Sequence, residues 1–126
     1  MDYLISNGRC DLIHTGGRVC KENRSSVGEL SAQFLRNISI DIAFISTSSW
    51  NLQGLTTPDE NKLPVKRAIV QASRRNILVT DSSKYGKVAT FLLYALDTLD
   101  QIICDKALLI NAQEKIKEMD IELLLV

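Results

Sequence analysis

Residues 64–86, PVKRAIVQASRRNILVTDSSKYG, decide the fold class of this chain. Pro64 suits the first turn of a helix, where its missing N–H group leaves no hydrogen bond unmade. The apolar side chains that follow recur at the spacing of one helical face: Val65, Ala68, Ile69 and Ala72. Residues 76–80 then form an apolar run that stops at the polar segment 81–86, which is typical of a buried strand followed by a loop. A helix that leads into a buried strand is one half of a β-α-β unit.

Two apolar runs upstream predict further strands of the same sheet. Residues 40–45 are apolar except for Asp41, a pattern typical of a strand covered on both faces. Residues 11–14 are a shorter run, and Gly16 and Gly17 follow it at a point where the backbone must turn sharply or approach something closely. We therefore expect a buried strand that ends in a glycine turn, and a second buried strand about thirty residues later.

A helix is expected between these two strands. Ser25 and Ser26 could cap its first turn, and Glu29 is close enough to Ser26 to complete a capping box. The helix should end at about Asn37. Its apolar stripe would be Leu30, Phe34, Leu35 and Ile38.

Residues 50–59, which mix asparagine, glycine, threonine and proline, predict an irregular loop. After residue 86 the spacing of apolar residues is less regular, and residues 88–96 fit a helix or a strand equally well. The remaining elements are expected to be a strand, a short helix and a terminal strand, at residues 98–104, 112–119 and 121–126.

Strands that alternate with helices at this spacing predict an α/β fold, with a mostly parallel sheet, right-handed connections and helices on both faces. No linker, repeat or low-complexity tract divides residues 1–126, so we expect a single domain. Residues 2–7 look like the tail of a helix whose preceding strand is missing. They predict a chain that begins inside a larger domain.

The composition excludes several classes of function. Fifteen basic residues balance fifteen acidic ones, so bulk charge gives no surface for nucleic acid or anionic lipid. Cys10, Cys20 and Cys104 are odd in number and widely spaced, with His14 as the only nitrogen ligand, which favours idle thiols over a zinc site or disulfides. No apolar run approaches the roughly twenty residues that cross a bilayer, and the N-terminus does not resemble a signal peptide. We expect a soluble cytoplasmic protein without a cofactor or a membrane partner.

Three candidate strand ends should meet at the carboxyl edge of the sheet, where ligands of such sheets bind. They bring glycine N–H groups from Gly16 and Gly17, hydroxyls from Ser46 and Thr47, and one ammonium group from Lys84. Asp81 and Ser83 lie beside that lysine in the sequence. Backbone donors, hydroxyls and an ammonium are the groups that bind phosphate and sugar oxygens. The sequence therefore predicts a pocket for a phosphorylated small molecule.

Each of these residues also has a structural interpretation. Serine, aspartate and glycine are common in any loop, and a single lysine at a strand end is more often solvated than bound to a ligand. Arg74 and Arg75 could contact phosphate, although on the last turn of a helix they would complement its dipole. Trp50 and Tyr85 flank the expected pocket and could contact a ligand, the core or an interface.

Catalysis has less support. His14 falls within a predicted buried strand, where a core imidazole is favoured over a general base. No serine has a histidine and an aspartate placed for a relay, and activation of Ser82 or Ser83 by the adjacent Lys84 has no other support.

Six blocks follow one another in an order and spacing that resembles the C-terminal sensor domain of DeoR-family bacterial transcription regulators. The resemblance covers nearly the whole chain, and the motif Ile102-Ile103-Cys104-Asp105 fits the family's apolar pair before Thr-Asp, with cysteine in place of threonine. The blocks are GGRV at 16–19, SVG at 26–28, DIAFI at 41–45, GLTT at 54–57, VKRA at 65–68 and DSSKYG at 81–86.

The resemblance implies a fold shared with ribose-5-phosphate isomerases and coenzyme A transferases. It also implies a domain that binds a sugar phosphate and thereby alters DNA binding by a separate N-terminal winged helix, and it adds Thr56 to the candidate ligand contacts. Family members usually carry a first strand with a Gly-Thr-Thr type loop upstream. That strand and the winged helix are missing here, so we expect this chain to contact DNA only through a missing N-terminal part.

In the related isomerases an acidic cluster follows the strand that matches residues 41–45 and supplies the catalytic base. Here residues 46–49 are Ser-Thr-Ser-Ser, and no carboxylate follows until Asp59. The leading hypothesis is therefore a sensor domain without enzymatic activity that belongs to a transcriptional repressor. A sugar-phosphate isomerase-like or degenerate enzyme is the first alternative. The second is an oligomerisation module without ligand, because the loss of a first strand would expose a sheet edge that another copy could cover, and a homo-oligomer is expected.

Overall fold

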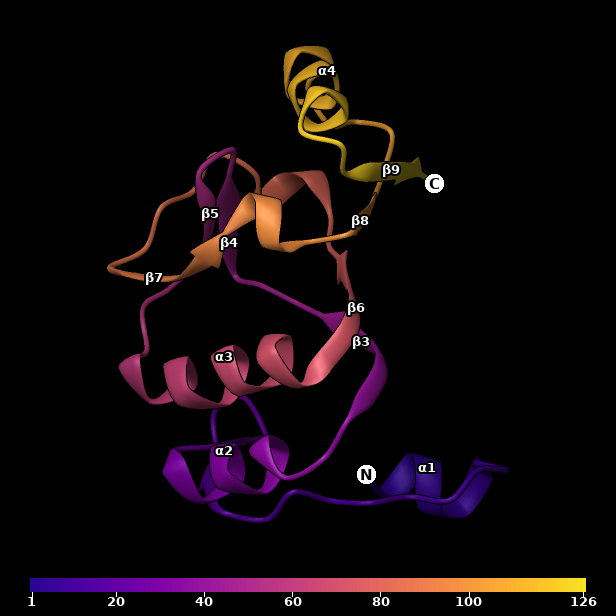
Figure 1. The fold of residues 1–126 in the computed structure, drawn as a ribbon, viewed down its shortest axis with the longest axis vertical. Coiled ribbons are helices and arrows are strands. Elements are labelled where there is room, and N and C mark those ends of the chain that lie inside the picture. Colours follow the sequence, from indigo (N-terminus) through magenta and orange to yellow (C-terminus); the bar gives the residue numbers. More distant parts are fainter.

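A four-stranded parallel sheet runs along one side of the protein in the computed structural model, which describes residues 1–126 (Figure 1). Its strands lie in the order β3, β6, β8 and β9, with bounds Ile40–Ile45, Ser73–Val79, Gln101–Cys104 and Glu122–Leu125. All three pairings between neighbouring strands are parallel. The predicted α/β class and the parallel sheet are therefore confirmed.

Two helices stack on one side of this sheet. Helix α3 (Leu63–Ala72) begins with Pro64 in its first turn, as predicted, and packs against β3 and β6. Helix α2 (Glu29–Arg36) packs on the outer side of α3 (Figure 1). The other helices are α1 (Asp2–Asn7) and α4 (Ile110–Glu118), with 3-10 turns η1 (Glu60–Lys62), η2 (Ser82–Lys84) and η3 (Leu96–Thr98). None of the helices is long and apolar enough to span a membrane.

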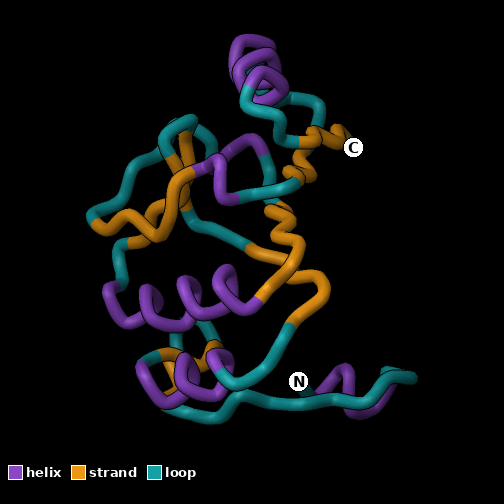
Figure 2. The backbone as a smooth tube through the Cα atoms, in the orientation of Figure 1, coloured by secondary structure: helices purple, strands orange, loops and turns teal.

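A second, antiparallel sheet lies on the side of α3 that faces away from α2, and Figure 2 shows its short strands apart from the parallel sheet. It consists of β4 (Ser49–Asn51), β5 (Gly54–Thr57) and β7 (Phe91–Ala95). The prediction of an irregular loop at residues 50–59 is wrong, because β4 and β5 form a hairpin. The side-chain oxygen of Asn51 accepts hydrogen bonds from the backbone N–H groups of Gln53 (2.8 Å) and Gly54 (3.2 Å), which closes the turn.

The structure corrects the prediction at residues 11–14, which form no strand. No strand pairs with them, and Ile13 is 80% exposed. An apolar run forms a strand only where a neighbour takes up its backbone hydrogen bonds, and none lies beside this one. His14 is accordingly exposed rather than a core imidazole, and its Nδ1 accepts a hydrogen bond from the backbone N–H of Gly16 (3.0 Å).

The predicted capping box at Ser26 is also wrong. Ser25 and Ser26 belong to β2 (Ser25–Val27), which forms a hairpin with β1 (Arg18–Cys20). Helix α2 instead starts after Gly28, whose φ of 86° suits a glycine, and Glu29 forms an ion pair with Arg36. The end of the helix, at Arg36, agrees with the prediction.

The buried side of α2 differs in part from the predicted stripe. Leu35 is buried as expected, but Leu30 is 69% exposed, and Ser31 and Ala32 are buried in its place. The side of α2 that is buried is the side that packs on α3. Tertiary packing therefore decides which positions are buried, and Leu30 stays exposed although it is apolar.

Arg74 and Arg75 lie on strand β6 and not on the last turn of a helix, because α3 ends at Ala72 and the strand starts at once with Ser73. The guanidinium group of Arg75 donates hydrogen bonds to the side-chain oxygens of Gln101 and Glu122, each at 3.0 Å. Arg75 therefore links three strands of the parallel sheet, and its role is structural.

Most of the core lies between the parallel sheet, the antiparallel sheet and α4. Its fully buried members include Trp50, Leu55, Leu78 and Ile102. Trp50 is 0% exposed, and its ring packs edge-on against Tyr85 with 4.9 Å between ring centroids. Of the three roles considered for Trp50, the structure selects the core.

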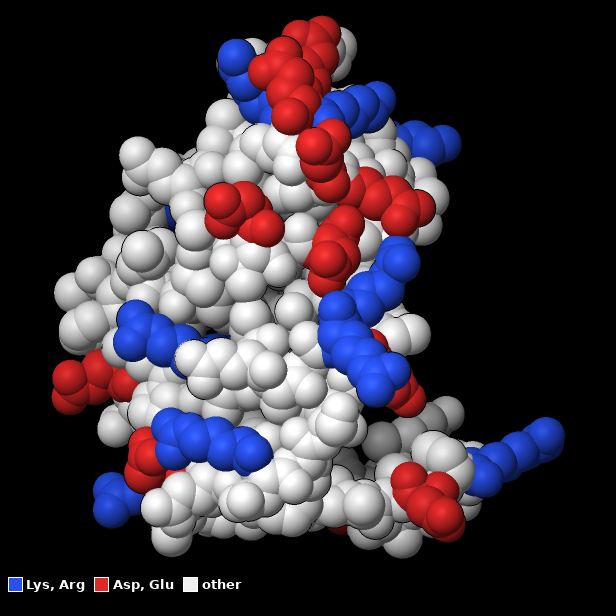
Figure 3. Space-filling view, in the orientation of Figure 1, with Lys and Arg blue, Asp and Glu red and all other residues white.

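The opposite face of the parallel sheet is open. Ile42 and Phe44 of the edge strand β3 are 50% and 71% exposed, and Val79 of β6 is 45% exposed. The prediction that residues 40–45 are covered on both faces is therefore wrong for this chain. Charged side chains of both signs are interspersed over the face drawn in Figure 3, in line with the balanced composition.

Candidate functional site

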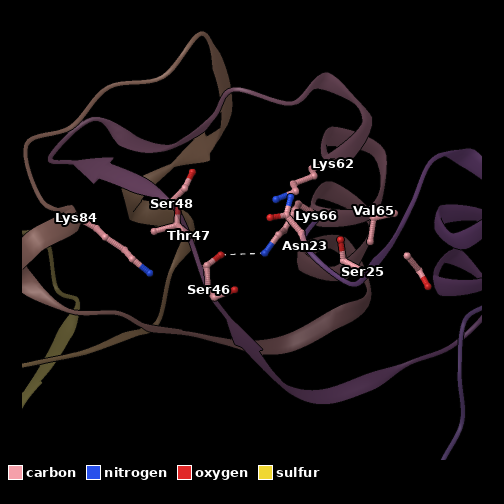
Figure 4. Close-up of a pocket in the computed structure, with 10 residues that line it drawn as sticks. Asn23, Ser25, Ser46, Thr47, Ser48, Lys62, Val65, Lys66 and Lys84 are labelled. Carbon is pink, nitrogen blue, oxygen red and sulfur yellow. Dashed lines mark hydrogen bonds between the residues drawn. The ribbon is translucent and has the colours of Figure 1, made fainter. Parts of the chain in front are cut away.

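A polar cavity of about 310 Å³ lies where β3 ends, between the start of α3, the β1–β2 hairpin and the turn η2 (Figure 4). The carboxyl ends of parallel strands are where ligands of α/β sheets bind, and the volume is at the lower end of the range for small-molecule sites. The cavity is lined by Asn23, Ser25, Ser26, Ser46, Thr47, Ser48, Lys62, Val65, Lys66 and Lys84.

Three lysines and no carboxylate line this cavity. Lys84 comes from η2, after β6, whereas Lys62 ends η1 and Lys66 lies in the first turns of α3. None of the three forms an ion pair, since the salt bridges of the structure join other residues. Unpaired ammonium groups in one cavity produce a positive potential there, so the cavity favours an anionic ligand.

The pKa of Lys66 is shifted by its surroundings. Burial lowers the pKa of its ammonium, and the charge of Lys62 lowers it further. Its Nζ donates a hydrogen bond to the backbone carbonyl of Ser46 at 2.9 Å (Figure 4). A carbonyl compensates an ammonium less well than a carboxylate or a phosphate does, so an anion in the cavity would raise this pKa again.

Hydroxyl groups supply the remaining donors. Ser46 and Ser48 lie between the lysines in Figure 4, and the hydroxyl of the buried Thr47 donates to the carbonyl of Ser49 (2.8 Å). The Oγ of Ser25 is buried and has no hydrogen-bond partner. A buried hydroxyl without a partner is uncommon, and a ligand oxygen in the cavity would provide one.

The turn that carries Lys84 is held by two aspartates that do not line the cavity. Asp81 accepts hydrogen bonds from the backbone N–H (2.9 Å) and the hydroxyl of Ser83. Asp105, after β8, accepts from the backbone N–H (2.6 Å) and the hydroxyl (2.8 Å) of Ser82. These hydrogen bonds lower the pKa of both carboxyl groups, so the turn contains two stable anions. Asp81 and Ser83 therefore position Lys84 and lie outside the cavity lining.

The other predicted site residues are divided between the cavity and its surroundings. Lys84, Ser46 and Thr47 line it as expected. Gly16 and Gly17 do not: Gly17 has a φ of 91° and packs closely on Ser31 of α2, whose hydroxyl donates to the carbonyl of Gly16. The two glycines therefore let the chain before β1 pack closely on α2.

Thr56 also lies outside the main cavity. Its buried Oγ1 accepts a hydrogen bond from the backbone N–H of Ala89 (2.9 Å) and lies 2.6 Å from the Oγ of Ser49. It lines a smaller cavity of about 60 Å³, and both cavities share Ser46, Thr47, Ser48, Lys62 and Lys66. Thr56 therefore lies next to the main cavity, and its hydroxyl already has hydrogen-bond partners within the protein.

Sequence reasoning missed Lys62, Lys66 and the hairpin residues. The two lysines are four residues apart at the start of a helix, a spacing that places them on one side. That spacing is common on solvated helix faces, and nothing local marks it as a site. Asn23, Ser25 and Ser26 reach the cavity because they belong to the β1–β2 hairpin, whereas the sequence predicts a helix cap at Ser25 and Ser26.

Comparison with known proteins gives a consistent result. The family model described as the DeoR C terminal sensor domain matches residues 1–106. The chain is 70% identical over 124 residues to an uncharacterised HTH-type transcriptional regulator of Haemophilus influenzae, and 53% identical over 123 residues to another of Escherichia coli. It is 27% identical over 124 residues to a putative aga operon transcriptional repressor of Escherichia coli. Each match covers 98% of this chain but 48%, 48% and 46% of the relative, so the chain spans about half the length of the curated relatives that it matches.

Proposed function

Because this chain belongs to the family of DeoR C-terminal sensor domains, we propose that it binds a phosphorylated sugar and thereby controls a DNA-binding transcriptional regulator. The observation that carries this proposal is the cavity at the end of β3, in which three lysines meet with no carboxylate. Ammonium and hydroxyl donors together match the oxygens of a phosphate and a polyol. Repression is the proposed sign of regulation, because three relatives are named repressors, whereas one, from Haemophilus influenzae, is named an L-fucose operon activator.

We propose binding without turnover. Sugar-phosphate isomerisation needs a base that removes a proton from carbon, and aspartate, glutamate and histidine are the usual choices. The cavity lining contains none of these. Asp81 and Asp105 do not line the cavity, and their hydrogen bonds with the η2 turn lower the pKa of both carboxyl groups, which makes them poor bases.

A thermal-shift experiment tests the proposal. Glucose 6-phosphate, fructose 6-phosphate, 6-phosphogluconate and glycerol 3-phosphate are each added to the chain, alongside the same compounds without phosphate. At a ligand concentration a hundredfold above its dissociation constant, binding stabilises the folded state by about 2.7 kcal/mol, a melting-temperature rise of several degrees. At least one phosphorylated compound should produce this rise, and its unphosphorylated counterpart should not.

Two double variants test whether the ligand that raises the melting temperature binds in the cavity. Lys66→Met combined with Lys84→Met should remove most of the rise, because the cavity then keeps only one of its three ammonium groups, that of Lys62. Lys87→Met combined with Lys106→Met removes the same charge from two exposed lysines outside the lining and should leave the rise intact. The proposal fails if no phosphorylated compound stabilises the protein, or if the two double variants behave alike. Turnover of any of these sugars by the wild type above background would favour the enzyme alternative.

The open sheet face supports a second candidate function, self-association. Ile42, Phe44 and Val79 expose apolar surface on one side of the sheet, and β3 is an edge strand whose outer backbone groups are unpaired. A second copy that pairs with this edge would cover both the backbone and the apolar side chains. On this hypothesis the chain is a homo-oligomer whether or not a ligand is bound.

Phe44→Glu is expected to shift the chain from oligomer to monomer, because it places a charge in the contact. Leu30→Glu is the matched control, since Leu30 on α2 is 69% exposed and Phe44 is 71% exposed. Sedimentation velocity at several protein concentrations measures the change. Self-association through this face is excluded if the wild type is monomeric at all concentrations, or if both variants dissociate it equally.

A further inference from the structure

We propose that the cavity selects a phosphorylated sugar acid, with its phosphate at Lys62 and Lys66 and its carboxylate at Lys84. This inference rests on the proposed function and names the ligand class of the same site. Figure 4 shows the arrangement on which it depends: Lys84 extends into the cavity from one side, Lys62 and Lys66 extend from the other, and Ser46 and Ser48 lie between them.

The topology of the fold keeps the two groups of lysines apart. Strands β3 and β6 are parallel neighbours, so Ser46 at the end of β3 lies beside the chain that leaves β6 toward Lys84. Helix α3 runs back to the start of β6, which places its first turns, with Lys62 and Lys66, over the end of β3. Because Ser46 and Ser48, just after β3, lie between the two groups of lysines (Figure 4), a ligand with two charged ends is suited to contact both groups at once.

The numbers of charges on the two sides match two different anions. A phosphate monoester carries a charge of about −1.5 to −2 near neutral pH, and two ammonium groups meet it at Lys62 and Lys66. One ammonium group remains at Lys84, which a carboxylate neutralises. The charge of Asp81 acts on Lys84 from outside the lining, but the two form no salt bridge. A sugar phosphate with a neutral far end would therefore leave Lys84 without an ion-pair partner, because no residue of the lining supplies one.

The middle of the cavity suits the hydroxylated carbons of a short sugar chain. Ser46 and Ser48 face it, and the buried Ser25 hydroxyl has no partner within the protein. Val65 is the only apolar side chain of the lining, and no aromatic ring is present on which a nucleobase could stack. The arrangement therefore favours a phosphorylated sugar acid over a nucleotide that carries the same charges.

Matched pairs of probes test this inference by isothermal titration calorimetry on the full chain. 6-Phosphogluconate and glucose 6-phosphate have the same carbon number and phosphate. They differ at the first carbon, which is a carboxylate on an open chain in the acid and the hemiacetal carbon of a ring in the sugar, so glucitol 6-phosphate is added as the open-chain compound without the carboxylate. Fructose 1,6-bisphosphate and fructose 6-phosphate form a second pair, in which the added group is a phosphate. A charge-assisted contact at Lys84 should make 6-phosphogluconate bind at least tenfold more tightly than glucose 6-phosphate.

The variant Lys84→Met should remove most of this preference, because it weakens the acid at least tenfold and glucose 6-phosphate much less. Lys87→Met, in the exposed chain just after η2, should preserve the preference. Equal affinity within the first pair, or equal weakening of both members by Lys84→Met, overturns the inference while the proposed function stands. A larger gain in the bisphosphate pair than in the acid pair overturns the carboxylate assignment. If no probe of either pair binds, the inference is overturned, and the proposed function fails as well if glycerol 3-phosphate also leaves the melting temperature unchanged.

Discussion

Replacing Lys66 with methionine is expected to raise the melting temperature of the ligand-free protein and to weaken the binding of 6-phosphogluconate at least tenfold. Burial lowers the pKa of this ammonium in the folded protein, which means that folding disfavours its charged form. Methionine keeps an apolar stem of similar length without the charge. The carbonyl of Ser46 loses one hydrogen bond (2.9 Å), but Ser46 is exposed, so water can replace the lost donor. Binding weakens because a charge-assisted hydrogen bond to phosphate contributes about 1.5–3 kcal/mol.

The same residue predicts a pH dependence with a defined sign. In the unfolded chain Lys66 has its ordinary pKa of 10.5, and in the folded chain its pKa is lower. Between these two values the unfolded state holds more protons, so the free energy of unfolding increases as pH rises through this window. Ligand affinity should fall over the same rise in pH, because Lys66 loses the proton with which it binds phosphate. Lys62 and Lys84 also face the cavity, so the wild type is compared with Lys66→Met. In the variant, both the free energy of unfolding and the ligand affinity should depend less on pH.

Urea unfolding and calorimetric titration at a series of pH values measure these effects. Lys106→Met, at an exposed lysine outside the cavity, serves as the control and should change neither stability nor binding by much. A Lys66→Met protein that is less stable than the wild type would show that the ammonium is compensated in the folded state. Unchanged affinity would show that phosphate does not bind at Lys66.

Trp50→Ala is expected to destabilise the protein by about 3–5 kcal/mol, the usual cost of deleting a large buried aromatic side chain. Trp50 is 0% exposed and belongs to the main core. Its backbone carbonyl also accepts a hydrogen bond from the N–H of Gly86 (2.8 Å), and its ring packs on Tyr85, so it anchors the chain next to Lys84. Since whole domains are stable by only about 5–15 kcal/mol, the variant should be close to unfolding at 37 °C.

Trp50→Phe separates packing from hydrogen bonding. The indole Nε1 of Trp50 is buried and has no hydrogen-bond partner, so its removal breaks no hydrogen bond. The variant should therefore lose much less stability than Trp50→Ala and should keep the melting-temperature rise produced by ligand. Far-UV circular dichroism in urea is the measurement, because Trp50 is the only tryptophan and its fluorescence is lost in both variants. A Trp50→Ala protein that loses less than about 1 kcal/mol would contradict its place in the core.

The sequence predicted the positions of the parallel strands because each is a continuous apolar run, although β3 is exposed at Ile42 and Phe44. Residues 40–45 match β3 in full, and residues 76–80 match most of β6. The helix that begins near Pro64 and the terminal strand were predicted for the same reason, since each buries a regular pattern against the core. Strand ends then placed Ser46, Thr47 and Lys84 at one edge, and all three line the cavity.

The errors occur where a distant partner decides the local structure. The segment with Trp50 and Gly54 reads as a loop, yet it is a hairpin because β7, more than thirty residues later, pairs with β5. Ser26 and Glu29 carry a capping signal, but the β1–β2 pairing takes Ser26 into a strand. At residues 11–14 the opposite occurs, because an apolar run has no neighbour with which to pair.

Local sequence patterns are enough to predict the β-α-β order, the strand ends near the site and a lysine just after β6. Local patterns are sufficient for these features because each depends on residues close together in the chain. Only the tertiary structure brought Lys62 and Lys66 opposite Lys84, because α3 must first fold back over the end of β3. The lowered pKa of Lys66 likewise exists only in the fold, since its causes are burial and a neighbouring charge in space.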